Sequence, residues 1–199
     1  FFKKKTPLEN KKILITAGPT YEPIDPVRFI GNRSSGKMGL ELAKEAVELG
    51  ANVRLILGPN SLDLKSYDGK LINVSTAEEM HKETILYFKN SDIFISAAAI
   101  SDFKPKSIDT LKIKKEKKLN HIELEPTKDI LLEISKIKNN QIVIGFALET
   151  DNEYENAKNK LKQKKLDAII LNSLKDKSSG FDFNTNKISY IKKNGSIKK

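Results

Sequence analysis

The sequence predicts an α/β fold, a three-layer sandwich in which helices cover a mainly parallel sheet. Two observations predict it. Short apolar runs rich in β-branched residues alternate along the chain with segments whose apolar residues recur at helical spacing. Each helical segment is long enough to serve as the crossover that two neighbouring parallel strands require. We therefore expect a β-α-β-α-β succession followed by further α-β units.

The first half of the chain contains three predicted strands and two predicted helices. The strands cover residues 12–17, 53–57 and 92–98, and the helices cover residues 37–49 and 77–89. The turn Gly18-Pro19 closes the first strand, and Gly50 stops the first helix, because these residues do not continue regular structure.

The second half continues the alternation after a basic stretch. Residues 104–118 carry many lysines and show no clear period, so we expect a long, basic, mobile segment there. A helix over 128–138, a strand over 141–147, a helix over 153–164 and a strand over 167–171 follow. The tail 181–191, with a turn at 184–186 between two short β runs, predicts a C-terminal β-hairpin.

Composition excludes several classes of site. The 199 residues include 36 Lys and Arg against 26 Asp and Glu, a net charge of +10, and no cysteine. The chain therefore has no disulfide, thiol nucleophile or cysteine metal site. His81 and His121 lie 40 residues apart, which disfavours a histidine metal site and histidine catalysis. The longest uncharged apolar run, 93–101, is far shorter than the ~20 residues of a membrane span, so we expect a cytoplasmic protein and no membrane contact.

The positive charge suits an anionic partner. Only three arginines are present, and they are not interleaved with aromatic residues as a nucleic-acid surface requires. We therefore expect no nucleic-acid partner, although a basic nucleic-acid-binding domain stays an alternative hypothesis.

Residues 31–37 satisfy the pattern G-x-x-x-x-G-K of phosphate-binding loops. Met38 stands where a hydroxyl should hold Mg²⁺, and the strand that should feed the loop ends well upstream at Ala17. A P-loop-like NTP hydrolase or kinase is thus the weaker alternative. Ser34, Ser35 and Gly36 at a helix start nevertheless offer hydroxyl and N–H groups to an anion. The competing interpretation is an ordinary serine N-cap.

The stretch 16–30 is non-helical, and its three prolines argue against regular structure. A simple connection between strand and helix takes about 2–6 residues, so a longer one is more typical of a binding loop. The dinucleotide fingerprint G-x-G-x-x-G is absent here, which disfavours a dehydrogenase.

Seven sequence blocks together resemble the bacterial phosphopantothenoylcysteine synthetases, over about residues 7–191. The blocks occur in order and spacing at 15–20, 24–28, 32–39, 50–53, 97–103, 112–115 and 145–150. The resemblance implies a Rossmann-like three-layer sandwich with a mainly parallel sheet and a C-terminal β-hairpin. It also implies one nucleotide-binding ligase domain over 12–199, with 1–11 as a linker or fragment boundary after a flavin-dependent decarboxylase half.

The activity implied by this resemblance is a ligase of coenzyme A biosynthesis. Such enzymes activate the carboxylate of 4′-phosphopantothenate with CTP, releasing pyrophosphate and forming an acyl-cytidylate. The amine of L-cysteine then displaces CMP and forms the amide. Mg²⁺ would come with the nucleotide phosphates, so no metal ligands of the protein are expected. The resemblance further implies a homodimer.

Two residues have catalytic roles by the same resemblance. Asn32 would hold the acyl-cytidylate and assist its reaction with cysteine. Lys112 would lie on a mobile basic flap, about residues 104–120, that closes over the triphosphate and excludes water. From the residues alone, Asn32 is better explained as a turn residue.

The nucleotide-binding residues implied by the resemblance fall on strand ends and helix starts. Most relatives have proline at position 128, where this chain has lysine. Without the resemblance, Phe146 would be a core residue, and the lysines at 160 and 164 a solvated helix face. Besides Ser34, Ser35, Gly36 and Lys112, the expected set is Ser96, Ala97, Ala98, Asp102, Lys128, Asp129, Ile130, Leu131, Phe146, Lys160 and Lys164.

Overall fold

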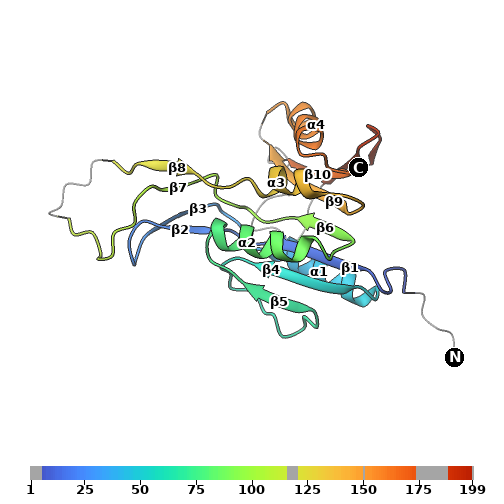
Figure 1. The fold of residues 1–199 in the computed structure, drawn as a ribbon, viewed down its shortest axis with the longest axis horizontal. Coiled ribbons are helices and arrows are strands. Elements are labelled where there is room, and N and C mark those ends of the chain that lie inside the picture. The colour runs from blue at the N-terminus through green and yellow to red at the C-terminus, as the bar shows by residue number, and fades with distance from the viewer. Residues whose placement is uncertain (1–5, 116–120, 150, 174–187, 199) are drawn as a thin grey trace.

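The computed structural model describes residues 6–115, 121–149, 151–173 and 188–198. Its centre is an eight-stranded sheet of strand order β12-β11-β10-β9-β6-β1-β4-β5 (Figure 1). The parallel strands are β1 (Lys12–Ala17), β4 (Asn52–Leu57), β5 (Lys70–Asn73), β6 (Ile93–Ser96), β9 (Ile142–Glu149) and β10 (Ala168–Ser173). The α/β prediction is confirmed.

Four helices of the described residues cover the sheet, and all four lie where the sequence predicts them. They are α1 (Lys37–Glu48), α2 (Ala77–Phe88), α3 (Ile130–Ile137) and α4 (Glu153–Gln163). Gly50, at φ 93°, lies just beyond the end of α1 as expected for a glycine that terminates a helix. A capping box of Thr76 and Glu79 begins α2.

A C-terminal hairpin closes one edge of the sheet. β11 (Ile188–Lys192) pairs antiparallel with β10 and with β12 (Ile197–Lys198). The turn expected at 184–186 lies outside the described residues, and the described hairpin turns later, between 192 and 197. The first run of the expected hairpin lies outside the described residues too, and the described hairpin is a different one, formed by β11 and β12.

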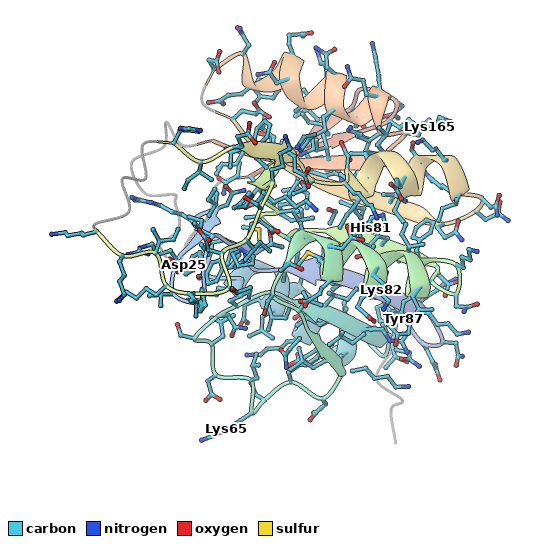
Figure 2. All side chains as sticks on the ribbon, turned by 60° about the vertical axis from the view of Figure 1, so that its left-hand side comes forward. Asp25, Lys65, His81, Lys82, Tyr87 and Lys165 are labelled. Carbon is cyan, nitrogen blue, oxygen red and sulfur yellow. The ribbon has the colours of Figure 1, made fainter. Side chains whose placement is uncertain are left out.

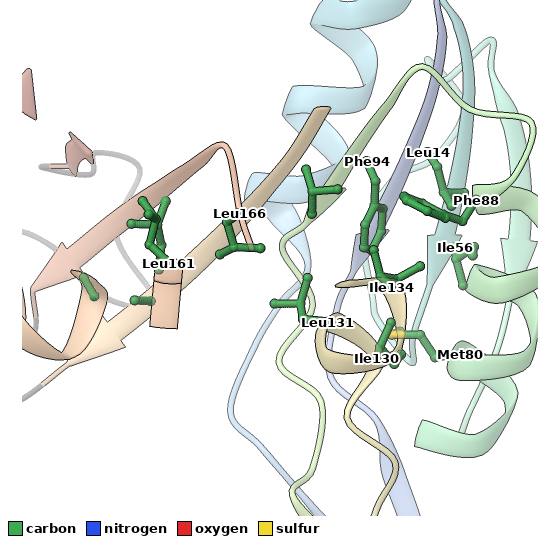
Figure 3. Close-up of a cluster of buried hydrophobic side chains, with 14 of the residues drawn as sticks. Leu14, Ile56, Met80, Phe88, Phe94, Ile130, Leu131, Ile134, Leu161 and Leu166 are labelled. Atoms are coloured by element: carbon green, nitrogen blue, oxygen red, sulfur yellow. The ribbon is translucent and has the colours of Figure 1, made fainter. Parts of the chain in front are cut away.

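Two apolar clusters, one on each face of the sheet, form the core. Side chains alternate along β1, so that Leu14 joins the cluster under α2, α3 and α4, whereas Ile13 and Ile15 join the cluster under α1. In the first cluster, Phe88 and Phe94 meet edge to face with centroids 5.9 Å apart (Figure 3). Such a pair adds about 0.5–1.5 kcal/mol beyond its buried area.

Two predictions of irregular structure are corrected. The stretch 16–30 contains β2 (Tyr21–Pro23) and β3 (Phe29–Gly31), which pair antiparallel. The basic segment starts with β7 (Phe103–Pro105), which pairs with β8 (Leu124–Pro126). Prolines end three of these four strands, where the missing N–H interrupts no ladder. The edge strand β5 was not predicted from the sequence.

The two short ribbons lie side by side and project from the sheet (Figure 1). We call residues 21–31, 103–115 and 121–126 the arm. A hydrogen bond from the Asp109 amide to the Ile24 carbonyl, of 3.0 Å, joins the ribbons. The pairs Lys104–Glu125 at 3.2 Å and Lys106–Glu123 at 3.3 Å join β7 and the residues beyond it to the β8 side. The start of the expected flap is therefore part of a paired structure.

Gly39 allows α1 to lie directly on the central strand. A Cβ at this position would lie 2.3 Å from the Cβ of Ala17, which is completely buried. We predict that Gly39→Ala destabilises the fold by about 1–3 kcal/mol, because overpacking outweighs the gain of about 1 kcal/mol in helix propensity. Urea unfolding measures the change.

The control for this prediction is Glu41→Ala on the exposed side of the same helix. It removes only the ion pair with Lys44, of 3.3 Å. A surface pair of this kind is worth about 0–1 kcal/mol. Equal stability of the Gly39→Ala variant and the wild type would contradict the close packing of α1 on β1.

Candidate active site

The order of strands reverses at β1, and the candidate site lies at the carboxyl end of this strand. β1 pairs with β4 on one side and with β6 on the other, so the chain leaves these strands in opposite directions. In open α/β sheets, ligands bind at this position. The chain beyond β6 continues along the extension of β1, since Ala97 donates to the Thr16 carbonyl (3.0 Å) and Ala99 to the Gly18 carbonyl (2.9 Å).

The start of α1 lies next to this strand end. Gly36 is the N-cap residue in a left-handed conformation, φ 78°, and a Cβ there would approach the Gly18 Cα to 3.1 Å. Ser34 and Ser35 form turns by accepting from the Gly36 and Lys37 amides, at 3.3 and 3.4 Å. No side chain caps α1, so the interpretation of a serine N-cap is wrong.

This geometry also weighs against a P-loop. The strand preceding the loop is β3, which pairs only with β2 in a separate two-stranded ribbon. A P-loop would instead follow directly from a strand of the main sheet. The positive end of the α1 dipole and the two serine hydroxyls remain as an anion-binding feature.

Asn32 bridges the two sides of the reversal point. Its side-chain amide donates to the Ile100 carbonyl at 2.8 Å, so a residue following β3 is bound to the chain beyond β6. Nearby, the Thr20 hydroxyl accepts from the Ser101 amide at 3.0 Å, and the Thr127 hydroxyl donates to the Ser101 carbonyl at 2.6 Å. The Asn32 side chain is thus bound to a chain segment that is itself hydrogen-bonded to Thr20 and Thr127.

β6 and β9 separate where the expected nucleotide residues lie. Their pairing ends at Ser96 opposite Gly145, while β9 continues beside β10 to residue 149. Ala97 and Ala98 follow on the β6 side and Phe146 follows on the β9 side. Small side chains and a half-buried aromatic ring therefore flank the place where the two strands diverge.

Lys160 enters the same region from α4. Its ammonium group donates to the Phe146 carbonyl at 2.8 Å. Burial lowers the pKa of Lys160, although the carboxylates of Glu149, Asp129 and Asp102 act in the opposite direction. The alternative interpretation as a solvated helix face is therefore wrong for this lysine, which is turned toward the Phe146 carbonyl.

The start of α3 completes this corner. Asp129 is its N-cap, accepts from the Leu132 amide at 2.9 Å and forms an ion pair with Lys164. Burial would raise the pKa of the Asp129 carboxyl, but the Lys164 and Leu132 contacts outweigh it and the net pKa is lowered. Ile130 and Leu131 are buried in the core, so only their backbone can face a ligand.

Lys128 turns toward α2. Its ammonium group lies 2.8 Å from the Glu78 carboxylate. Position 128 therefore adds a link between α2 and the start of α3. A second link joins the same helices, since His81 Nε2 lies 2.6 Å from Glu133 Oε2.

Lys112 lies on the arm, apart from the corner formed by β6, β9, α3 and α4. Its side chain is exposed, and the next residue, Ile113, is buried. The backbone of Ile113 contacts Asp25 and Arg28 of the other ribbon. The structure therefore brings the β6, β9, α3 and α4 residues together and places Lys112 with the β2–β3 ribbon.

Three residues of this ribbon were missed as site residues. Asp25 and Arg28 stand within one of the seven blocks, which could have signalled them, but no role was assigned to them. Glu22 had no sequence signal: its buried carboxylate accepts from the Ala77 amide at 2.9 Å and so binds the ribbon to the start of α2.

Two negative findings apply to the described part of the chain. It contains no group of three or more His, Cys, Asp or Glu residues that could hold a metal ion. Within the same residues, no helix is both long and apolar enough to cross a membrane.

Comparisons with known proteins agree with this architecture. The model of the family described as DNA/pantothenate metabolism flavoprotein C-terminal domain matches residues 8–199. The coenzyme A biosynthesis bifunctional protein CoaBC of Bacillus subtilis is 45% identical over 189 residues, which are 95% of this chain and 47% of that protein. The CoaBC protein of Borreliella burgdorferi is 50% identical over 180 residues, covering 87% of this chain and 45% of that protein.

Another relative, of an unknown prokaryotic organism, carries the name cysteine/cysteine sulfinic acid decarboxylase. It is 49% identical over 204 residues, which cover 100% of this chain and 57% of that protein. This chain thus spans about half the length of the curated relatives that it matches.

A solved structure of a related protein has a similar fold. The crystal structure of the C-terminal domain of a CoaBC protein superposes with a TM-score of 0.81 at 39% identity, covering 98% of this chain and 87% of that one. The expected resemblance is confirmed at the level of the family: the chain belongs to the DNA/pantothenate metabolism flavoprotein C-terminal domain family.

Proposed function

We propose that this chain is a phosphopantothenate–cysteine ligase of coenzyme A biosynthesis, built as one nucleotide-binding domain over residues 12–199. The observation that carries the proposal is Asn32, bound to the chain beyond β6 at the point where the strand order reverses. Two relatives named as coenzyme A biosynthesis proteins support it, at 45% and 50% identity. Their additional length is consistent with fusion of this domain to a decarboxylase half.

The proposed reaction activates the carboxylate of 4′-phosphopantothenate with CTP. An oxygen of the carboxylate attacks the α-phosphorus, pyrophosphate leaves, and an acyl-cytidylate forms. The nitrogen of L-cysteine then attacks the acyl carbon, and CMP leaves as the amide forms. Neither step requires a protein nucleophile, so positioning and charge neutralisation supply most of the rate. We expect the enzyme in the cytoplasm.

The nucleotide would lie at the separation of β6 and β9. Ala97 and Ala99 donate to β1, so the Ala98 amide between them points to the opposite side, toward β9. An amide and carbonyls at a strand end can bind the edge of a base, and Phe146 can stack on its face. Lys160 and Lys164 place two cations in this corner. Mg²⁺ would be bound by the phosphates of the nucleotide.

Asn32 is suited to the second step. One N–H of its side chain donates to the Ile100 carbonyl, and this hydrogen bond orients the amide. The remaining N–H and the carbonyl oxygen can bind the acyl-cytidylate and orient the amine of cysteine. Lys112 is suited to the first step, because an exposed ammonium group on the arm can neutralise a leaving pyrophosphate.

The arm also supports a homodimer. Seven of the thirteen exposed large apolar side chains among the described residues lie on it, and Leu111 is 80% exposed. The seven are Val27, Phe29, Phe103, Ile108, Leu111, Ile122 and Leu124. A projecting apolar surface of this kind is typical of an interface. We propose that two copies associate through their arms and that the active site lies near this interface.

The first test of the function is pyrophosphate release by the purified chain. We expect release with CTP that depends on 4′-phosphopantothenate and does not depend on cysteine, with lower rates for ATP, GTP and UTP. Release without phosphopantothenate would instead favour an NTP hydrolase. Tight oligonucleotide binding that weakens steeply with salt, without pyrophosphate release, would favour a nucleic-acid-binding domain.

The two catalytic assignments predict different failures. Lys112→Ala should slow acyl-cytidylate formation by about 10²–10³-fold, the usual effect of losing one strong contact to a transition state. Asn32→Asp should form the intermediate and react poorly with cysteine, because a carboxylate replaces the amide donor. Rapid-quench mass spectrometry detects the intermediate. Its equal loss in both variants would show that the roles are wrongly divided.

The dimer prediction is tested with Leu111→Asp, which places a charge on the apolar surface of the arm. We expect the wild type to be a dimer and the variant to be a monomer in light scattering. Leu86→Asp is the matched control, because Leu86 is also exposed but lies on α2. A monomeric wild type at high concentration would contradict the dimer.

A further inference from the structure

Both ribbons of the arm meet at one buried carboxylate. The side chain of Asp25 is completely buried, at the end of the β2–β3 ribbon and away from the helices (Figure 2). Its Oδ1 accepts from the Val27 amide at 2.7 Å and from the Arg28 amide at 2.8 Å. Its Oδ2 accepts from the Ile113 amide at 3.1 Å and forms an ion pair with the Arg28 guanidinium group. One oxygen therefore shapes the turn, and the other holds the second ribbon.

Ile113 is held on both sides of its backbone. While its amide donates to Asp25, its carbonyl accepts from Arg28 Nη1 at 3.2 Å, and its side chain is only 7% exposed. Lys112 directly precedes this residue and is exposed. The hydrogen-bonded backbone of Ile113 therefore anchors the adjacent backbone of Lys112, while the Lys112 side chain stays exposed.

The charge state of Asp25 suits a permanent attachment. Burial alone would raise the pKa of its carboxyl, but the amides of Val27, Ile113 and Arg28 and the Arg28 guanidinium group lower the pKa to about 2. A carboxyl with a lowered pKa contributes its stabilisation above its unfolded-state pKa of about 4. That contribution declines as the pH falls below about 4 and is lost once the pH has fallen through about 2. At any ordinary assay pH the carboxylate is charged.

We propose that Asp25 is a positioning residue for the ligase reaction, which sets the place of Lys112 through the backbone of Ile113. The inference rests on the proposed function and deepens it. Asp25 touches no reacting atom; it determines where the ammonium group that meets the leaving pyrophosphate is anchored. The competing explanation is that Asp25 only stabilises the arm.

The test variant is Asp25→Asn in the full chain. Asparagine retains an oxygen for the turn amides of Val27 and Arg28 but places an NH₂ group against the Ile113 amide and the Arg28 guanidinium group. The turn is therefore retained while the attachment of Ile113 is broken. We expect faster hydrogen exchange of the Ile113 amide, and acyl-cytidylate formation slowed by up to about 10²-fold, the effect of misplacing a group by roughly 1 Å.

A double-mutant cycle with Lys112→Ala separates positioning from mere stability. If Asp25 acts through Lys112, then Asp25→Asn should change the rate by less than about threefold in a chain that already lacks the Lys112 ammonium group. A purely structural role would slow both backgrounds by the same factor, and that result would overturn the proposal. The control is Asp63→Asn, which alters a comparable turn on another loop, where Asp63 accepts from the Lys65 amide at 3.0 Å.

The outcomes also distinguish this inference from the proposed function. A wild-type chain that forms no acyl-cytidylate from CTP and 4′-phosphopantothenate would overturn both. A wild-type chain that forms it, with Asp25→Asn equally fast, would overturn the positioning role alone. Faster hydrogen exchange of the Ile113 amide with an unchanged rate of acyl-cytidylate formation would also overturn the positioning role. The hydrogen bond to Asp25 would then be lost without any effect on Lys112.

Discussion

The rest of this structure depends on the hydrogen bonding of β1 to β4 on one side and to β6 on the other. The crossover from β1 to β4 places α1 on one face of the sheet, whereas the later connections place α2, α3 and α4 on the other face. No crossover then covers the carboxyl end of β1. The chain segments that follow β1, β3 and β6 meet there, and Asn32 can bind a carbonyl 68 residues away in the sequence.

Backbone contact distances then determine what can lie at this end. The absence of side chains at Gly36 and Gly39 lets α1 approach Gly18 and Ala17, and its uncapped N-terminus lies beside the strand end. On the other side, the chain beyond β6 follows the extension of β1, and its pairing with β9 ends at Ser96 opposite Gly145. The same end of the sheet therefore offers positive backbone dipoles to an anion and exposed backbone to a base.

The arm projects from the sheet and is held together by contacts of its own. Its two ribbons are too short to be stable alone. The buried Asp25 carboxylate joins them to each other, and the buried Glu22 carboxylate joins the β2–β3 ribbon to the start of α2. Its apolar side chains remain exposed, which leaves them available to a second copy. Cations of the arm and cations of α4 thus reach the proposed reaction from different parts of the fold.

The sequence by itself determined the α/β class, the four helices and the main parallel strands, because hydrophobic periodicity, Gly50 and Gly18-Pro19 act within a few residues. It also indicated the glycine-rich start of α1. Only the tertiary structure decided that 21–31 and 103–126 contain paired ribbons. These segments are rich in proline and lysine, which do not favour strands, so their local sequence does not predict the pairing. Likewise, Lys160 contacts a residue 14 positions away, and Ile113 contacts Asp25, which is 88 positions away. No local sequence pattern predicts such contacts.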